Sequence, residues 1–281
     1  MNEIIKEIID KNNIHEDFIE VQTSGLANKI YMSNNFVLRI PTDHEEAISD
    51  ALTESVAAPI AYSHGIKTPR LICFDNSYSI LNKSYSIWER IHGLTFGELK
   101  TENYKNIWYE FGKELGKIHK RITECPDPNG WLDSADREDD IDSDKRALYT
   151  KQCKSEYLLN CIENYCTEKT YIYRTCFVHG DTHPFNILCG KSNKFLSIID
   201  WGDAGWADPA IDYYMIPIES IHYVLDGYQE ESAENINFEF LSRIILDKIF
   251  IGFDENKDTK ELENSIKLLE KNLKAFFERL T

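Results

Sequence analysis

Short apolar runs separated by turn-forming residues fill the first third of the chain. They predict a small sheet with strands at 18–23, 28–32, 36–40, 70–74, 78–81 and 85–91. Apolar residues at helical spacing predict a short helix near 4–9. A longer helix is predicted at 43–63, which starts on an Asp and stops at Gly65. This region should therefore be a small sheet accompanied by one long helix.

After His92-Gly93 the pattern changes to helical repeats. These cover 104–122, 147–167 and most of the C-terminal part, while two β-like runs at 185–189 and 195–199 flank a GKSN loop. The last helix has an apolar stripe shorter than three heptads, which favours packing within the chain, so we expect a monomer. The pattern predicts an α+β chain with a β-rich N-lobe at 1–91, a larger α-helical C-lobe at 92–281, and a ligand between them.

The composition is that of a globular protein with an excess of acidic residues. Of the 281 residues, 42% are hydrophobic, which is enough to bury one or two ordinary cores. The formal net charge of −17 argues against a nucleic-acid partner, which would need a basic face. The charge suits a cationic small molecule, because clefts lined by carboxylates concentrate positive ligands, although acidity also serves solubility alone.

Cysteine usage and hydropathy both indicate a cytoplasmic protein. The seven cysteines include no CxxC pair and no neighbouring histidine cluster, as is typical of reduced thiols. No stretch approaches the roughly 20 apolar residues of a membrane span. The N-terminal residues lack the basic region and the apolar run of a secretory signal. We therefore expect a cytoplasmic location and no membrane partner.

Two polar motifs set between apolar runs carry the chemistry. In HGDTHPFN, Asn186 follows Asp181 by five residues, and Asp200 of IDWG comes nineteen residues after Asp181. Phosphoryl transfer needs a carboxylate to orient the acceptor hydroxyl and take its proton. It also needs hard oxygen ligands for the Mg²⁺ that bridges the phosphates. Because the spacing matches the kinase template, we predict Asp181 as catalytic base and Asn186 and Asp200 as Mg²⁺ ligands.

These motifs together resemble a known family. The segments HGDTHPFN and IDWGDAGWADPAIDY are similar to those of the aminoglycoside phosphotransferases and their relatives, the antibiotic- and choline-kinase-like group. In that family a glycine, here Gly180, replaces the arginine of the kinase catalytic loop. The resemblance covers essentially the whole chain. It implies a bilobal protein-kinase-like fold that binds nucleotide through 1–91 and holds the catalytic loop, metal site and substrate site in 92–281.

The resemblance also implies which N-lobe residues surround the phosphates of ATP or GTP. Ser24 and Gly25 belong to a loop that covers the phosphates, although it has one glycine where fuller loops have three. Arg39, on the third strand, stands where lysine is commonest and should grip phosphate oxygens. Glu54 of the long helix, fifteen residues before Pro69, is expected to pair with Arg39.

The segment IWERIHG is expected to be the hinge that binds the purine. Backbone groups near Glu89 and Ile91 would bond the base, so the side chains of this segment do not distinguish ATP from GTP. The resemblance and its apolar neighbours suggest that His179 buttresses the catalytic loop. Asp208 and Asp212 are expected to bond backbone amides of that loop and to start a helix.

The acceptor is a small molecule with a hydroxyl group, and the resemblance places it on the C-lobe beside the catalytic Asp. The acidic run at 133–144 would attract a polyamine, although a solvated loop is the simpler interpretation. We predict transfer of the γ-phosphate to an aminoglycoside-like antibiotic, for which a cationic character would suit the charge of the chain. The sequence leaves open whether the role is antibiotic resistance or housekeeping.

Two kinds of alternative remain: another acceptor on the same fold, or a protein of another class. A macrolide 2'-phosphotransferase is favoured by Arg39 within VLRIP and disfavoured by Phe185-Asn186, where macrolide kinases tend to have Gly-His. A choline or sugar kinase would share the same fold. A nucleotide-binding pseudokinase or regulatory module belongs to another class, and the intact Asp181, Asn186 and Asp200 argue against it.

Overall fold

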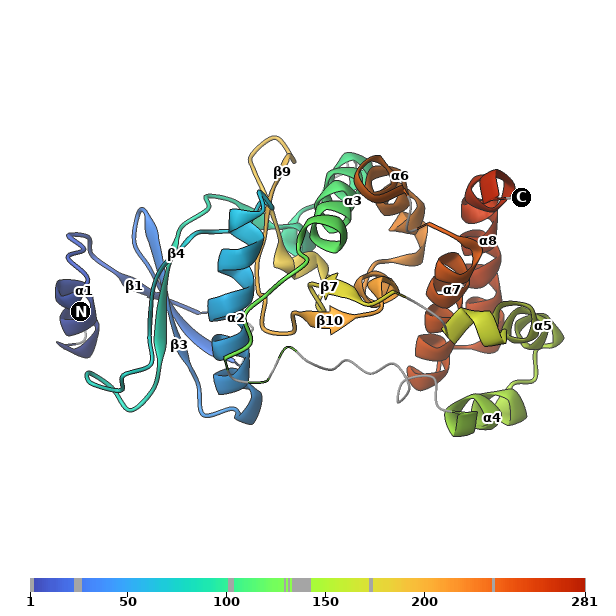
Figure 1. Ribbon diagram of the computed structural model, residues 1–281, viewed down its shortest axis with the longest axis horizontal. Coiled ribbons are helices and arrows are strands. Elements are labelled where there is room, and N and C mark those ends of the chain that lie inside the picture. The colour runs from blue at the N-terminus through green and yellow to red at the C-terminus, as the bar shows by residue number, and fades with distance from the viewer. Residues whose placement is uncertain are drawn as a thin grey trace. The chain divides into compact units, whose positions relative to one another are not determined.

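The chain forms two compact units. The computed structural model describes residues 3–22, 27–100, 104–128, 130, 132, 143–171, 174–233 and 236–280 (Figure 1). The first unit comprises Met1–Leu99, Glu124–Leu132 and Phe185–Ala204, and the second comprises Lys100–Thr123, Asp133–Pro184 and Gly205–Thr281. The predicted lobes, 1–91 and 92–281, divide the chain at a different place and stay a prediction.

A five-stranded antiparallel sheet forms the centre of the first unit. Its strand order is β1-β2-β3-β5-β4. The strands are β1 (Ile19–Val21), β2 (Asn28–Met32), β3 (Phe36–Pro41), β4 (Leu71–Asp75) and β5 (Tyr85–Glu89). Side chains alternate between the faces of a strand, so Leu38 and Ile40 of β3 are buried on one face while Arg39 points to the other.

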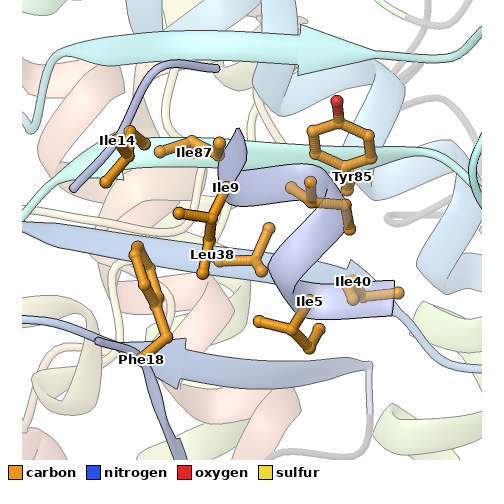
Figure 2. Packing of buried hydrophobic residues seen from close by; sticks show 9 residues of the cluster. Ile5, Ile9, Ile14, Phe18, Leu38, Ile40, Tyr85 and Ile87 are labelled. Atoms are coloured by element: carbon orange, nitrogen blue, oxygen red, sulfur yellow. The ribbon is translucent and has the colours of Figure 1, made fainter. Parts of the chain in front are cut away.

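Helix α1 (Glu3–Lys11) covers one face of this sheet. Its isoleucines are spaced so that three of them fall on one side of the helix and are buried. They belong to an apolar cluster that consists of Ile5, Ile8, Ile9, Ile14, Phe18, Leu38, Ile40, Tyr85 and Ile87 (Figure 2). Burial of each such side chain stabilises a fold by about 1.5–3 kcal/mol, so α1 is an integral part of the unit.

Helix α2 (Glu45–Ser63) lies on the opposite face of the sheet (Figure 1). It contacts β3, β4 and β5. Its buried positions include alanines, whose small side chains allow a close approach to the strands: Ala47, Ala57, Ala58 and Ala61. The helix stops just before Gly65, whose φ of 76° is in the left-handed region that glycine favours. The predicted helix at 43–63 is thus confirmed apart from its first two residues.

The predicted strand at 78–81 is wrong. Residues 79–81 form bends, and Tyr78 has a φ of 57°. The cause lies at the end of β4, where the carboxylate of Asp75 accepts hydrogen bonds from the backbone N–H and the hydroxyl of Ser77. An aspartate that bonds to the backbone two residues ahead turns the chain, so the apolar run that follows does not continue as a strand.

A smaller sheet of the first unit has the order β6-β8-β9. Its strands are β6 (Leu94–Thr95), β8 (Ile187–Cys189) and β9 (Phe195–Ile198). Two short 3₁₀ turns adjoin it, η1 (Phe96–Glu98) and η3 (Pro184–Asn186). Strands β8 and β9 form an antiparallel hairpin with Ile187 opposite Ile198. The two predicted β-like runs are therefore this hairpin, with the first strand starting two residues later than expected.

The second unit is mainly helical. Its helices are α3 (Tyr104–Arg121), α4 (Ser143–Gln152), α5 (Glu156–Tyr165), α6 (Ile221–Ser232), α7 (Phe238–Asp254) and α8 (Thr259–Leu280). Strand β7 (Cys176–Val178) pairs with β10 (Gly205–Ala207), and 3₁₀ turns occur at η2 (Glu168–Tyr171), η4 (Pro209–Tyr213) and η5 (Ile218–Ser220). The apolar stripe of α8 is buried within the chain, through Leu262, Ile266, Leu269, Leu273 and Phe276.

The helix predicted as one element at 147–167 is two helices, α4 and α5. The break falls at Cys153–Ser155. There the hydroxyl of Ser155 accepts a hydrogen bond from the backbone N–H of Leu158. Serine is a favoured N-cap, so it starts a second helix inside a continuous apolar pattern.

Helices α3 and α6 pack against each other with almost no space between their backbones. A Cβ atom at Gly112 would lie 2.0 Å from the carbonyl oxygen of Val224. A Cβ atom at Gly227 would lie 1.9 Å from the carbonyl oxygen of Tyr109. Glycine is the residue that allows such an approach, so these two positions fix α3 and α6 relative to each other. Within the described ranges, no helix combines the length and the apolar character needed to cross a membrane.

Candidate active site

The β8–β9 hairpin presents two of the predicted metal ligands at one end. Asn186 directly precedes β8, and its carbonyl oxygen accepts a hydrogen bond of 2.9 Å from the backbone N–H of Ile199. Asp200 is the next residue. The backbone pairing that continues the hairpin therefore brings Asn186 and Asp200 to the same end of the two strands. Asp200 has a φ of 68°, an uncommon conformation for a residue with a side chain.

A charged network joins Asp200 to the main sheet. Nη1 of Arg39 donates to Oε1 and Oε2 of Glu54, at 2.5 and 2.7 Å. Nη2 of Arg39 donates to Oδ1 of Asp200, at 3.0 Å. Strand β3 supplies the arginine on the face turned toward α2, and α2 supplies the glutamate. The structure thus brings together three of the residues selected from the sequence, as the resemblance implied for Arg39 and Glu54.

The electrostatics of this network favour a charged guanidinium. Burial would lower the pKa of Arg39, but the neighbouring carboxylates of Glu54 and Asp200 more than offset it, so its pKa is raised. The Asp200 side chain is 46% exposed, whereas the Arg39 and Glu54 side chains are 15% and 8% exposed. The network is therefore a buried ion pair with one accessible carboxylate at its edge.

Asp50 of α2 adds a further carboxyl group that the sequence did not single out. Partial burial, together with the carboxylates of Asp203 and Asp200, raises the pKa of Asp50 to about 6. A Cβ atom at Gly202 would lie 2.7 Å from the Cβ of Asp50, so the glycine of the IDWG motif allows this close approach. Negative charge gathers around Asp200, which favours a cation there.

Trp201 anchors the chain next to Asp200. Its side chain is 1% exposed, and its indole N–H donates a hydrogen bond of 3.0 Å to the hydroxyl of Thr68. A buried aromatic ring with a satisfied N–H is a rigid support. Trp201 therefore holds the segment that carries Asp200 in place.

Asp181 belongs to the second unit, in the loop that follows β7. Its backbone N–H donates to Nδ1 of His179, at 3.3 Å. Gly180 has a φ of 86°, which a larger residue would adopt only with strain. His179 is fully buried, as expected for a histidine that supports the loop.

The side chain of Asp212, in η4, binds the backbone of this loop. Oδ2 of Asp212 accepts from the backbone N–H of His179 at 3.0 Å, and Oδ1 accepts from that of Gly180 at 2.8 Å. The backbone carbonyl of Asp212 accepts a bond of 2.7 Å from the hydroxyl of Thr182. Asp208 caps the start of η4 by accepting from the backbone N–H of Ala210. Asp212 thus binds the loop amides, and Asp208 starts the helical turn.

A buried histidine supports Asp212 from α3. Nε2 of His119 lies 2.9 Å from Oδ2 of Asp212, and Nδ1 lies 3.0 Å from the hydroxyl of Tyr228 on α6. Sequence reasoning missed this histidine, although a signal existed. His119 follows Leu115 by four residues, which places it on the apolar side of α3. A polar residue on a buried face needs hydrogen-bond partners, and here it has two.

The predicted hinge, residues 87–93, begins within β5, which ends at Glu89. The backbone N–H of Glu89 donates to the carbonyl oxygen of Arg70, so this group is already used. Ile91 lies two residues beyond the end of β5. A Cβ atom at Gly93 would lie 2.6 Å from the carbonyl oxygen of Cys189, so the chain passes close to β8 here. The purine contacts of Glu89 and Ile91 remain a prediction.

Some predicted positions lie outside the described residues. Ser24 and Gly25 of the phosphate loop are among them, and so are residues 133–142 of the acidic run. In the described part of the chain, no group of three or more His, Cys, Asp or Glu side chains is arranged to hold a metal ion. The amide of Asn186 and the carboxylate of Asp200 nevertheless fit Mg²⁺, which takes one or two protein oxygens and completes its shell with phosphates and water.

Solved structures share this fold along nearly the whole chain. The ADP-bound aminoglycoside phosphotransferase APH(2'')-Ib is 19% identical, with 98% of this chain and 99% of that chain covered and a TM-score of 0.57. The gentamicin complex of APH(2'')-IIa is 18% identical, covers 96% of each chain and has a TM-score of 0.57. A choline/ethanolamine kinase family protein from Mesorhizobium loti is 16% identical, covers 96% of this chain and 95% of that chain, and has a TM-score of 0.58.

These likenesses confirm the predicted α+β, kinase-like fold. No curated protein matches the chain. A family model, described as the phosphotransferase enzyme family, matches residues 20–230. This range includes the Arg39 network, the hairpin with Asn186 and Asp200, and the loop with Asp181. The chain is therefore a member of the phosphotransferase enzyme family.

Proposed function

We propose that this phosphotransferase is a small-molecule kinase that transfers the γ-phosphate of ATP or GTP to a hydroxyl of an aminoglycoside-like antibiotic. The observation that carries the proposal is the contact of Arg39 with both Glu54 and Asp200. A buried arginine next to an exposed carboxylate offers phosphate oxygens a cation and offers a metal ion an anion. The ADP and GDP complexes among the similar structures support a nucleoside triphosphate as co-substrate.

The nucleotide would be held by groups of the N-terminal residues. Arg39, fixed by Glu54, binds the α- and β-phosphates, and Ser24 and Gly25 cover them. Backbone groups near Glu89 and Ile91 bond the purine. Asn186 and Asp200 would hold Mg²⁺, which neutralises the charge of the phosphates when bound.

Asp181 acts on the acceptor. Its carboxylate orients the hydroxyl and takes the proton as the oxygen attacks the γ-phosphorus. A new bond forms between that oxygen and phosphorus, and the bond from the γ-phosphorus to the β–γ bridging oxygen breaks. The products are the phosphorylated acceptor and the nucleoside diphosphate. Most of the rate enhancement comes from positioning and from charge neutralisation.

A second candidate acceptor has support of its own. One similar structure belongs to a choline/ethanolamine kinase family protein, so a choline-like alcohol is the main competitor. A macrolide acceptor agrees with Arg39 in VLRIP. An excess of 17 negative charges suits the cationic acceptors in this set better than the neutral sugars.

The test is acceptor-dependent turnover of ATP and of GTP by the purified protein with Mg²⁺. The panel contains aminoglycosides, macrolides, choline, ethanolamine and simple sugars, with Asp181→Asn as the blank. We expect turnover with an aminoglycoside and none with the variant. Turnover with choline alone would replace the aminoglycoside-like acceptor of the proposal by a choline-like alcohol. Nucleotide binding without turnover on any acceptor would favour a regulatory module and overturn the proposal.

A further inference from the structure

We propose that Tyr228 is a positioning residue for the catalytic loop, because its hydroxyl holds the ring of His119 in the orientation that supports Asp212. The idea rests on the proposed function, since it assigns a role in the reaction to a residue remote from the reacting groups. Tyr228 lies on α6 and is fully buried. Its hydroxyl belongs to a hydrogen-bonded chain that leads to the two peptide groups just before Asp181.

The chain of hydrogen bonds is continuous. The hydroxyl of Tyr228 lies 3.0 Å from Nδ1 of His119, and Nε2 of His119 lies 2.9 Å from Oδ2 of Asp212. Asp212 then accepts from the backbone N–H groups of His179 and Gly180. The members of this chain are at most 5% exposed, apart from Gly180, so water does not replace a lost bond at its centre.

The charge of Asp212 decides which nitrogen of His119 carries a proton. Burial would raise the pKa of Asp212, but the hydrogen bond from His119, together with the backbone N–H of His179, more than offsets it, so the pKa is lowered. An ionised carboxylate only accepts hydrogen bonds. The proton of His119 must therefore be on Nε2, facing Asp212.

The other nitrogen then needs a donor. In a neutral imidazole with Nε2–H, Nδ1 is an acceptor, and the hydroxyl of Tyr228 is placed to donate to it. Without that hydroxyl, Nδ1 is a buried acceptor that has lost its donor, which favours a rotated ring. Rotation of the ring removes the donor from Asp212 and loosens the loop that carries Asp181.

The close packing of α3 and α6 restricts the movement of both side chains. His119 is on α3 and Tyr228 is on α6, the pair of helices that glycines bring into backbone contact. A Cβ atom at Gly116 would lie 3.0 Å from the carbonyl oxygen of Tyr228, so α3 passes close to this residue as well. The rings of His119 and Tyr228 meet edge to face, with centroids 5.4 Å apart. The hydroxyl has little freedom to leave His119.

Tyr213 provides a matched control. It is also buried and packs edge to face on Tyr228. Its hydroxyl has no hydrogen-bond partner among the described residues. Tyr213→Phe and Tyr228→Phe therefore remove the same atom from neighbouring rings, but only the second removes a bond to His119.

The first test is kinetic and uses the acceptor identified by the turnover panel. Tyr228→Phe should lower kcat by roughly three- to tenfold, the rate equivalent of one neutral hydrogen bond. The KM for nucleotide should not change, and Tyr213→Phe should behave as the wild type. In a His119→Gln background, where an amide that has no tautomers bonds Asp212, Tyr228→Phe should have almost no further effect on kcat. Independent, multiplicative losses would show mere packing and overturn the proposal.

The second test does not depend on turnover. Nitrogen-15 spectra of the protein labelled on histidine rings, with His119 assigned from His119→Gln, should show Nε2–H in the wild type and in Tyr213→Phe. In Tyr228→Phe they should show that the hydrogen bond from Nε2–H to Asp212 is lost. Nδ1–H in the wild type, or a bond from Nε2–H to Asp212 that persists in Tyr228→Phe, would refute the role of Tyr228. Absence of turnover while the bond from His119 to Asp212 is intact would instead refute the proposed function.

Discussion

Nη2 of Arg39 and Oδ1 of Asp200 lie 3.0 Å apart, although 161 residues separate them along the chain. The arginine is mostly buried and also bound to Glu54, while the Asp200 side chain is nearly half exposed. Asp200 can therefore turn to another cation without leaving Arg39 unpaired. This asymmetry explains how one residue can belong to an ion pair in this structure and serve as a metal ligand in the proposed reaction.

Removal of Arg39 should weaken both the fold and nucleotide binding. Arg39→Ala leaves the buried carboxylate of Glu54 without its cation, so we expect a loss of about 3 kcal/mol in the free energy of unfolding. Arg39→Lys keeps the charge but loses the fork geometry of the guanidinium. Its stability and its nucleotide affinity should therefore lie between those of the wild type and those of Arg39→Ala. Urea unfolding and calorimetric nucleotide titration measure both effects. Arg121→Ala is the control, since it breaks a more exposed ion pair with Glu231. Equal stability of the two alanine variants would contradict the role of Arg39.

Asp200 should govern the magnesium dependence of nucleotide binding. The wild type is expected to bind ATP or GTP more tightly with Mg²⁺ than without it. In Asp200→Asn this difference should disappear, because a neutral amide is a much weaker ligand for a hard cation than a carboxylate. Calorimetry with and without Mg²⁺ measures the difference directly. A variant that keeps the full magnesium effect would remove Asp200 from the metal site.

Asp181 should affect turnover and leave nucleotide affinity unchanged. Asp181→Asn is expected to lower kcat by at least about 100-fold, the lower range for a lost general base. The calorimetric affinity for nucleotide should stay at the wild-type value, because the proposed nucleotide ligands are other residues. Near-normal kcat in this variant would rule out Asp181 as the base.

Asp75 should stabilise the protein at neutral pH and lose this effect in acid. A hydrogen bond from Lys11, aided by Ser77 and Tyr85, holds the pKa of Asp75 well below its usual range. A carboxyl group whose pKa is lower in the folded state adds stability above its unfolded pKa, near 3.9, and loses it as the pH falls further. The stability difference between wild type and Asp75→Asn should thus be constant from pH 7 to about pH 5 and shrink toward pH 3.

The matched control for Asp75 is Asp43→Asn. Asp43 also contacts a lysine, Lys83, at the same 2.6 Å, but its side chain is 97% exposed, against 11% for Asp75. Exposed ion pairs contribute little, so Asp43→Asn should change the unfolding free energy far less than Asp75→Asn does at pH 7 and at pH 5. Parallel urea curves at pH 7, 5 and 3 decide the matter. If the difference in unfolding free energy between the wild type and Asp75→Asn did not change with pH, the charge of Asp75 would not contribute to stability.

Gly227 should tolerate no side chain. Gly227→Ala would place a Cβ atom 1.9 Å from the carbonyl oxygen of Tyr109 and force α3 and α6 apart. We expect a loss of roughly 1–3 kcal/mol or more in the free energy of unfolding, as for other overpacked sites. At Gly190 a Cβ atom would meet only Leu196, at 3.4 Å, so Gly190→Ala should be close to neutral. Thermal unfolding of the two variants tests the helix contact, and equal midpoints would be inconsistent with it.

Much of the fold could be predicted because local pattern and tertiary structure agree. The alternation in 28–32 gave the strand β2 with the same limits, and the spacing of Asp181, Asn186 and Asp200 suggested the family. Errors arose where a single polar side chain overrode an apolar pattern. Asp75 turned the chain before the expected strand at 78–81, and Ser155 opened a new helix.

The support of the catalytic loop was harder to foresee. The sequence indicated that Asp212 would bind loop amides, but not that His119 and Tyr228 stand behind it. These residues come from α3 and α6, and their meeting depends on helix packing that periodicity alone does not reveal. A histidine on the apolar face of a helix indicates that a hydrogen-bond partner exists, but the sequence pattern does not show which residue it is.

The backbone at Asp200 places folding and chemistry in conflict. Its φ of 68° is a conformation that costs an ordinary residue about 1 kcal/mol and costs glycine almost nothing. Glycine would adopt this conformation at less cost, but it would remove the carboxylate that pairs with Arg39 and that we propose as a metal ligand. Sequence design that scores backbone geometry alone would therefore replace this aspartate, whereas design that includes the proposed metal ion would keep it.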